Sequence, residues 1–142
     1  MHVREVKEIS RALEILSNEK IMIDARFLPA LELAERGEHM AWYEMQEAFA
    51  SGIQGVPKHY RLARRYTDKI KGFTSGDPKP EIETCLNSAS LEFDNGDFEK
   101  AKQELVQAVR VMCHHLSPEQ WDFRVFDMLY KILNQTETFV AN

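Results

Sequence analysis

The sequence has little that would tie it to disulfide, metal or membrane chemistry. It contains two cysteines, Cys85 and Cys113, and neither has a second cysteine near it in a CxxC pattern. Both lie among apolar residues at helical spacing, so we expect buried free thiols, as in proteins of a reducing compartment. Charged residues such as Arg4 and Lys7 replace the apolar region of a signal peptide. No apolar run approaches the roughly 18 residues of a membrane span. These absences predict a cytoplasmic protein.

An excess of positive charge is also missing. The chain of 142 residues carries a formal net charge of −5, whereas a protein that coats DNA or RNA is normally basic. Nucleic acid is therefore not an expected partner. Hydrophobic residues make up 44% of the sequence and charged residues 29%, which is typical of a globular protein of one domain.

The alternation of apolar and polar residues that marks β-strands is nearly absent. Apolar residues instead recur every three or four positions, which predicts about seven α-helices. We expect them over residues 3–16, 19–37, 38–50, 57–70, 80–93, 98–115 and 117–134. Because the connections are short, successive helices should form antiparallel hairpins.

Proline, glycine and capping residues set the predicted boundaries. Pro29 predicts a kink or the start of a new helix, and Pro57 suits the first position of the fourth helix. The stretch 72–80, GFTSGDPKP, reads as a linker. Ser117 and Gln120 form a capping-box pattern before the last helix.

Two segments share a pattern of packing residues. In each, a helix ends at a glycine turn, and an aromatic residue then precedes an alanine by three positions: Tyr60 with Ala63, and Phe98 with Ala101. The small alanine lets two helices approach closely, and the aromatic ring fills the space between hairpins. Glycine adopts the backbone conformation that closes the turn. This repetition is the pattern expected of stacked helical hairpins.

On these residues, positions 33–70 resemble a Sel1-like repeat, a bacterial relative of the tetratricopeptide repeat. The matching residues are Ala34, Gly37, Ala41, Met45, Phe49, Gly52, Gly55, Val56, Pro57, Lys58, Tyr60, Ala63 and Tyr66. Positions 84–110 are similar to a tetratricopeptide unit, through Ala89, Phe93, Gly96, Asp97, Phe98, Ala101 and Ala108. The first match departs from the family in having two residues between its glycines and His59 where aspartate is usual.

The resemblance implies an all-α fold, a short right-handed α-solenoid of antiparallel helix hairpins with a C-terminal capping helix. The single domain, residues 1–142, would consist of a degenerate N-terminal hairpin (1–37), a Sel1-like hairpin (38–72), a tetratricopeptide-like hairpin (80–115) and the capping helix (117–135). In such families the function is protein binding without catalysis. The resemblance therefore implies no enzyme activity and no cofactor.

The glycine turn does not match a phosphate-binding loop. In G-x-x-G-V-P-K, Lys58 follows Gly55 by three positions, no serine or threonine comes next, and no strand precedes the turn. Pro57 also removes one backbone N–H that such a loop would use.

Metal and nucleophile sites are not indicated either. Cys113, His114 and His115 are adjacent on a helix and point about 100° apart, so they cannot converge on one ion. His39 and His59 lack partners at ligand spacing. Turn and helix-cap chemistry explains Asp94 and Asp97. Glu44 and Glu47 share a helix face without the Glu-x-x-His motif of a di-metal site.

Positive charge gathers in one stretch. Residues 56–72 carry six lysine or arginine residues and one aspartate, while the remainder of the chain is strongly acidic. On a helix, Arg61, Arg64 and Arg65 share one side. This side is either a solvated surface that pairs with acidic neighbours such as Glu44 and Glu47, or a docking patch for an acidic peptide or protein.

These observations predict a protein–protein interaction module, an adaptor or inhibitor, that binds a partner protein or peptide with an acidic patch. One alternative is an immunity-type protein that neutralises a bacterial toxin or effector, and another is a structural homo-oligomer without a separate ligand. The expected contact zone comprises Trp42, Tyr43, Glu47, Arg61, Arg64 and Arg65.

Overall fold

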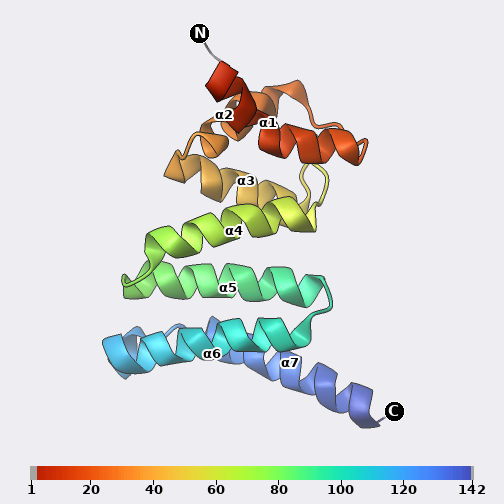
Figure 1. Ribbon diagram of the computed structural model, residues 1–142. Helices are drawn as coiled ribbons and strands as arrows, with labels where there is room; N and C mark the ends of the chain where they lie inside the picture. The colour runs from red at the N-terminus through yellow and green to blue at the C-terminus, as the bar shows by residue number, and fades with distance from the viewer. Residues whose placement is uncertain (1–2, 142) are drawn as a thin grey trace. The chain divides into compact units, whose positions relative to one another are not determined.

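The chain folds into helices joined by short turns (Figure 1). A computed structural model describes the backbone of residues 3–141 and the side chains of residues 11–135. Its α-helices are α1 (Val3–Asn18), α2 (Leu28–Glu35), α3 (His39–Ser51), α4 (Tyr60–Thr74), α5 (Pro78–Asp94), α6 (Phe98–His115) and α7 (Arg124–Ala141). Short 3₁₀ turns span Ala25–Phe27 and Pro118–Gln120. Within the described residues there is no β-strand, only an isolated bridge between Ile53 and Val56. The predicted all-α fold is confirmed.

The segment before α2 differs from the sequence prediction. We expected one helix from residue 19 to 37, but the backbone turns at Lys20, whose φ is +57°, and stays irregular up to the 3₁₀ turn. Asp24 caps that turn by accepting a hydrogen bond from the Arg26 backbone N–H at 3.0 Å. Pro29 then falls in the first turn of α2, where the missing N–H costs nothing. Of the two alternatives that proline suggested, a new helix beginning there is the correct one.

Other helix boundaries also differ from those predicted from the sequence. α4 begins at Tyr60, so Pro57 lies in the preceding loop and not at the first helical position. α5 begins at Pro78, which shortens the predicted linker. The capping box at Ser117 closes a 3₁₀ turn, and α7 begins only at Arg124 and continues to Ala141.

The chain divides into two compact units, Met1–Ile70 and Lys71–Asn142. In the first unit, α1 packs on α2 and α2 on α3, and α3 and α4 run antiparallel (Figure 1). The rings of Phe49 and Tyr66 stack with their centroids 6.3 Å apart. The core of this unit contains Leu31, Ala34, Met45, Phe49, Leu62, Ala63 and Tyr66, all buried.

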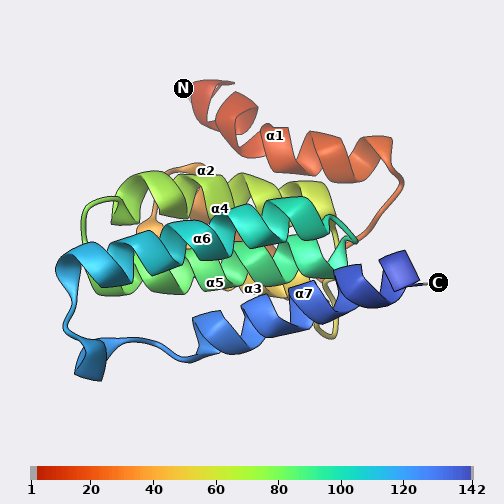
Figure 2. The ribbon, with the colours of Figure 1, turned by 90° about the horizontal axis from the view of Figure 1, so that it is seen from below.

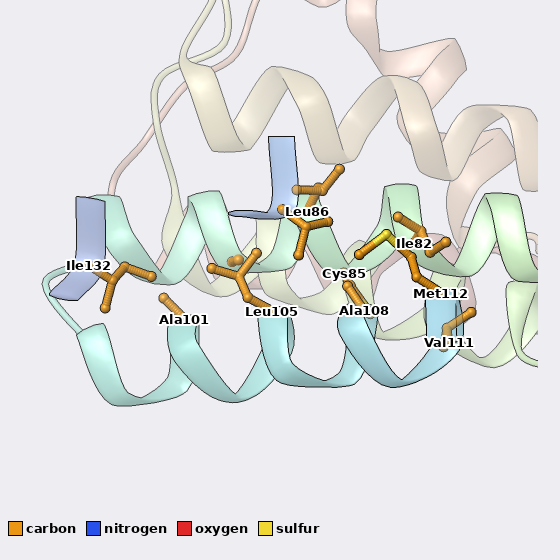
Figure 3. Packing of buried hydrophobic residues seen from close by; sticks show 11 residues of the cluster. Ile82, Cys85, Leu86, Ala101, Leu105, Ala108, Val111, Met112 and Ile132 are labelled. Atoms are coloured by element: carbon orange, nitrogen blue, oxygen red, sulfur yellow. The ribbon is translucent and has the colours of Figure 1, made fainter. Parts of the chain in front are cut away.

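The second unit is built on the antiparallel hairpin of α5 and α6, against which α7 packs (Figure 2). Figure 3 shows its core, a buried cluster that includes Cys85 and Leu86 of α5 and Leu105 and Ala108 of α6. Ala101 and Ala108 are completely buried, so the two helices approach closely where these small residues lie. The burial of these alanines agrees with their predicted role in the second hairpin, which is to let the two helices approach closely.

The two cysteines differ in environment. Both are free, but only Cys85 is buried, whereas Cys113 is exposed. The expectation of two buried thiols is wrong for Cys113, because this residue lies on the side of α6 away from the core that Met112 and Val111 enter. None of the described helices is long and apolar enough to cross a lipid bilayer.

Candidate docking surface

One side of α4 gathers four positively charged side chains of the first unit. Arg61, Arg64, Arg65, Asp68 and Lys69 follow the spacing i, i+3, i+4, i+7, i+8, which places them on one helix face. The opposite face is apolar and buried, through Leu62, Ala63, Tyr66 and Ile70. Burial of the apolar face therefore fixes the direction in which the charged face points. We call Arg61, Arg64, Arg65, Asp68 and Lys69, together with Tyr60, the α4 basic face.

The start of α4 is fixed by His59. Its backbone N–H donates to the Phe49 carbonyl at 2.8 Å, and its Nδ1 accepts from the backbone N–H of Leu62 at 3.1 Å. Nδ1 is therefore unprotonated, and Nε2 carries the proton that it donates to the Glu19 carboxylate. His59 thus caps the helix where the resembled repeat usually has aspartate. The hydrogen bond from His59 also lowers the pKa of Glu19.

The turn before His59 is held against the 3₁₀ turn that precedes α2. The Asp24 backbone N–H donates to the Gly55 carbonyl at 2.7 Å, and Arg26 Nη2 donates to the Gln54 carbonyl at 3.1 Å. Gly55 has φ +94°, and a Cβ at this position would lie 2.7 Å from the Cβ of Asp24. Only glycine fits here. Gly55 is therefore needed for the close contact between this turn and Asp24.

A buried carboxylate anchors the middle of α4. The Glu35 side chain is 0% exposed and accepts from Arg65 Nε at 3.1 Å and Arg65 Nη2 at 2.8 Å. The Tyr66 hydroxyl donates to the same carboxylate at 2.6 Å. Burial, together with this hydrogen bond, raises the pKa of Tyr66, so its hydroxyl stays protonated. Arg65 consequently has an internal structural role as well as a place on the α4 basic face.

The α4 basic face lines a shallow, open hollow of about 470 Å³. Four of its side chains are cationic and one, Asp68, is a carboxylate. Arg64 pairs with Asp68 at 3.2 Å within the helix, and Arg61 is 65% exposed, with Glu19 at 3.7 Å. Cationic groups therefore outnumber carboxylates at the hollow.

Trp42 of α3 extends this surface at one end. Lys69 Nζ lies 5.9 Å from the centre of the Trp42 ring, at the distance of a cation–π contact. The indole N–H donates to the Ala34 carbonyl at 2.8 Å, and the His39 ring packs at 4.8 Å. Trp42 is thus a half-buried aromatic in a fixed orientation.

The six residues of the predicted contact zone separate into two groups. Arg61, Arg64 and Arg65 line the hollow, and Trp42 is joined to them through Lys69. Tyr43 and Glu47 share a different side of α3, about 100° round the helix from Trp42, and do not line the hollow.

Sequence reasoning missed Tyr60 and Lys69 as members of this face, and Glu35 as its anchor. The i, i+4, i+8 spacing from Arg61 could have identified Lys69. The contact with Glu35 joins residues 30 positions apart, and no local pattern indicates it.

Chemistry of other kinds has little support among the described residues. No group of three or more histidine, cysteine or acidic side chains in this part of the chain could hold a metal ion. Cys85 borders a hollow of about 260 Å³ in the second unit, beside the ion pair of Lys71 with Glu104. Burial raises the pKa of the Cys85 thiol to about 11, so it is a poor nucleophile at neutral pH.

No protein-family model matches the chain, and no solved structure matches it significantly. The resemblance to Sel1-like and tetratricopeptide repeats therefore rests on the residues named above.

Proposed function

We propose that this chain is a protein–protein interaction module, an adaptor or inhibitor, that binds an acidic segment of a partner protein on the α4 basic face. The observation that carries the proposal is the open hollow lined by four cationic side chains in a chain whose net charge is −5. A positive patch on an acidic protein attracts a complementary acidic surface and disfavours nucleic acid, which the rest of the molecule repels.

The size of the α4 basic face suits a short peptide segment. Arg61 and Lys69 are eight residues apart on the helix, a separation of about 12 Å. An extended chain covers that length with about four residues. Side chains such as Arg61 present bidentate donors to carboxylates, and this geometry favours aspartate and glutamate.

Trp42 adds an apolar contact at the end of the same surface. Large, orientationally fixed aromatic side chains are frequent energetic anchors of interfaces, and Trp42 is held by its hydrogen bond to the Ala34 carbonyl. The segment that we propose therefore combines two or more carboxylates with one apolar side chain. The two free cysteines support a reducing compartment, and we include the cytoplasm in the proposal.

A charge-reversal pair tests this function. The probe is a fluorescent ten-residue peptide of alternating glutamate and glycine with one leucine, and binding is followed by anisotropy. Arg61→Glu with Arg64→Glu should weaken binding about tenfold or more, and raising the salt concentration should weaken binding to the unaltered chain.

Lys79→Glu with Lys100→Glu is the matched control. These two exposed lysines lie in the second unit, and their reversal changes the net charge by the same amount. The control should retain binding. Equal loss in both double variants would mean that net charge, and not the α4 basic face, governs binding, and the proposal would then fail. Circular dichroism checks that both variants are folded.

A further inference from the structure

α7 has more apolar surface than its packing in the second unit covers. One side of the helix enters the core through Val125 and Ile132, which are 0% and 1% exposed. On another side, Phe123, Tyr130 and Leu133 are 66%, 67% and 49% exposed. Phe123 is the residue directly before the helix, and its carbonyl accepts the Asp127 N–H at 3.0 Å, so it belongs to the same helical register.

These exposed residues form a stripe with Phe126. The stripe residues are Phe123, Phe126, Tyr130 and Leu133, and their spacing is three, four and three positions. Such spacing keeps all four on one side of a helix. It is also the same when read in either direction along the chain. Phe126 is half-buried against the ring of Trp121, so it supports the middle of the stripe.

We propose that this stripe binds a second copy of the same chain, with the two α7 helices antiparallel about a two-fold axis. Because the spacing is palindromic, the axis places Phe126 opposite Tyr130 of the second copy and Phe123 opposite Leu133 of the second copy. Every apolar residue of the stripe then meets an apolar residue, as a two-fold interface requires of a self-complementary surface.

The charges beside the stripe fit the same arrangement. Asp127 and Lys131 lie on one flank, about 80° and 120° round the helix from the stripe. In a two-fold antiparallel pair, this flank of one helix faces the same flank of the other. Lys131 of the second copy then lies about 3 Å along the helix axis from Asp127, within reach of an ion pair, and the pair occurs twice.

A hollow near the end of the stripe can accommodate a side chain of the second copy. It has a volume of about 540 Å³ and is lined by Phe98, Ile132 and Leu133 among others. The pairing brings Phe123 of the second copy to Leu133, at the border of this hollow. The phenyl ring of Phe123 is small enough to enter this hollow. Its insertion would bury the ring and the apolar lining of the hollow.

The pairing should be weak and dependent on concentration. Contact along three helical turns buries less area than the roughly 1,200 Å² of a standard stable interface. We therefore expect a monomer at low micromolar concentration and a dimer as the concentration approaches the millimolar range.

Sedimentation velocity over that range tests the proposal. The unaltered chain should shift from monomer to dimer, and Tyr130→Glu with Leu133→Glu should abolish the shift. Met22→Glu with Met40→Glu, at two exposed apolar residues of the first unit, is the matched control and should dimerise normally. A chain that stays monomeric up to about 1 mM, or a dimer that survives the α7 double variant, would overturn the proposal.

Charge exchange tests the antiparallel register. Asp127→Lys alone places lysine near Lys131 of the second copy and should weaken dimerisation at least tenfold, as should Lys131→Asp alone. The double exchange, Asp127→Lys with Lys131→Asp, restores opposite charges in the proposed register and should recover the dimer. Loss of dimerisation in the double exchange would contradict the register. None of these variants touches the α4 basic face, so the outcome is independent of the proposed function.

Discussion

At the scale of single residues, Glu35 shows how a buried charge is made acceptable. Its carboxylate receives two hydrogen bonds from Arg65 and one from the Tyr66 hydroxyl. A carboxylate removed from water is costly unless charged or polar donors replace the solvent. The arrangement therefore ties the end of α2 to the middle of α4.

Replacing this carboxylate should destabilise the fold. Glu35→Ala leaves Arg65 and the Tyr66 hydroxyl without their acceptor, and we expect a loss of about 2 kcal/mol in the free energy of unfolding, measured by urea denaturation. Glu32→Ala is the control, because Glu32 pairs with Arg36 on the exposed side of the same helix and should cost less than about 0.5 kcal/mol. Similar losses in both variants would mean that Glu35 has no special structural role.

At the scale of elements, the helices themselves could be predicted from apolar periodicity, since each predicted helix overlaps a helix of the structure. The boundaries at the beginning of α2 and α4 could not. Both are set by contacts between distant residues, such as Asp24 with Gly55 and His59 with Glu19. Proline and glycine positions indicate that a helix is interrupted. The residue at which the next helix begins depends on these contacts between residues far apart in the sequence.

The candidate docking surface could likewise be predicted only in part from the sequence. The clustering of Arg61, Arg64 and Arg65 on one face follows from helical spacing alone and could be predicted. That Trp42 joins this face through Lys69 while Tyr43 does not depends on the rotation of α3 about its axis. That rotation is fixed by burial of Met45 and Phe49, which the sequence only partly defines.

Replacing glycine by alanine should have opposite effects on the free energy of unfolding at two positions. Gly72 lies inside α4, and a Cβ there would meet no atom within 4 Å. Gly72→Ala should therefore raise the free energy of unfolding by about 0.5 to 1 kcal/mol, through the better helix propensity of alanine. Gly55→Ala should lower it by about 1 to 3 kcal/mol, since φ is positive there and Asp24 occupies the space. Thermal denaturation compares the two, and a stabilising Gly55→Ala would refute the tight turn.

At the scale of the whole molecule, each compact unit has its own core and its own tryptophan. Trp42 belongs to Met1–Ile70 and Trp121 to Lys71–Asn142, and the chain has no other tryptophan. Single-tryptophan variants can therefore follow the unfolding of each unit separately.

We expect Glu35→Ala to act mainly on the first unit. In a Trp121→Phe background, the fluorescence of Trp42 should report a lower urea midpoint, because the lost carboxylate belongs to the core of that unit. In a Trp42→Phe background, the transition of Trp121 should move less, since its surroundings are formed by α6 and α7. Equal shifts from both reporters would show instead that the chain unfolds as one cooperative unit.

The position of α4 affects how the two compact units could be expressed as separate fragments. The boundary between the compact units falls after Ile70, but the helix continues to Thr74. Its last turn is fastened by the ion pair of Lys71 with Glu104 and by the hydrogen bond of Thr74 with Thr84. A cut at residue 70 would truncate a continuous helix, and a cut at residue 75 would deprive Glu104 and Thr84 of their partners. Expressing either half alone thus requires a redesigned helix end.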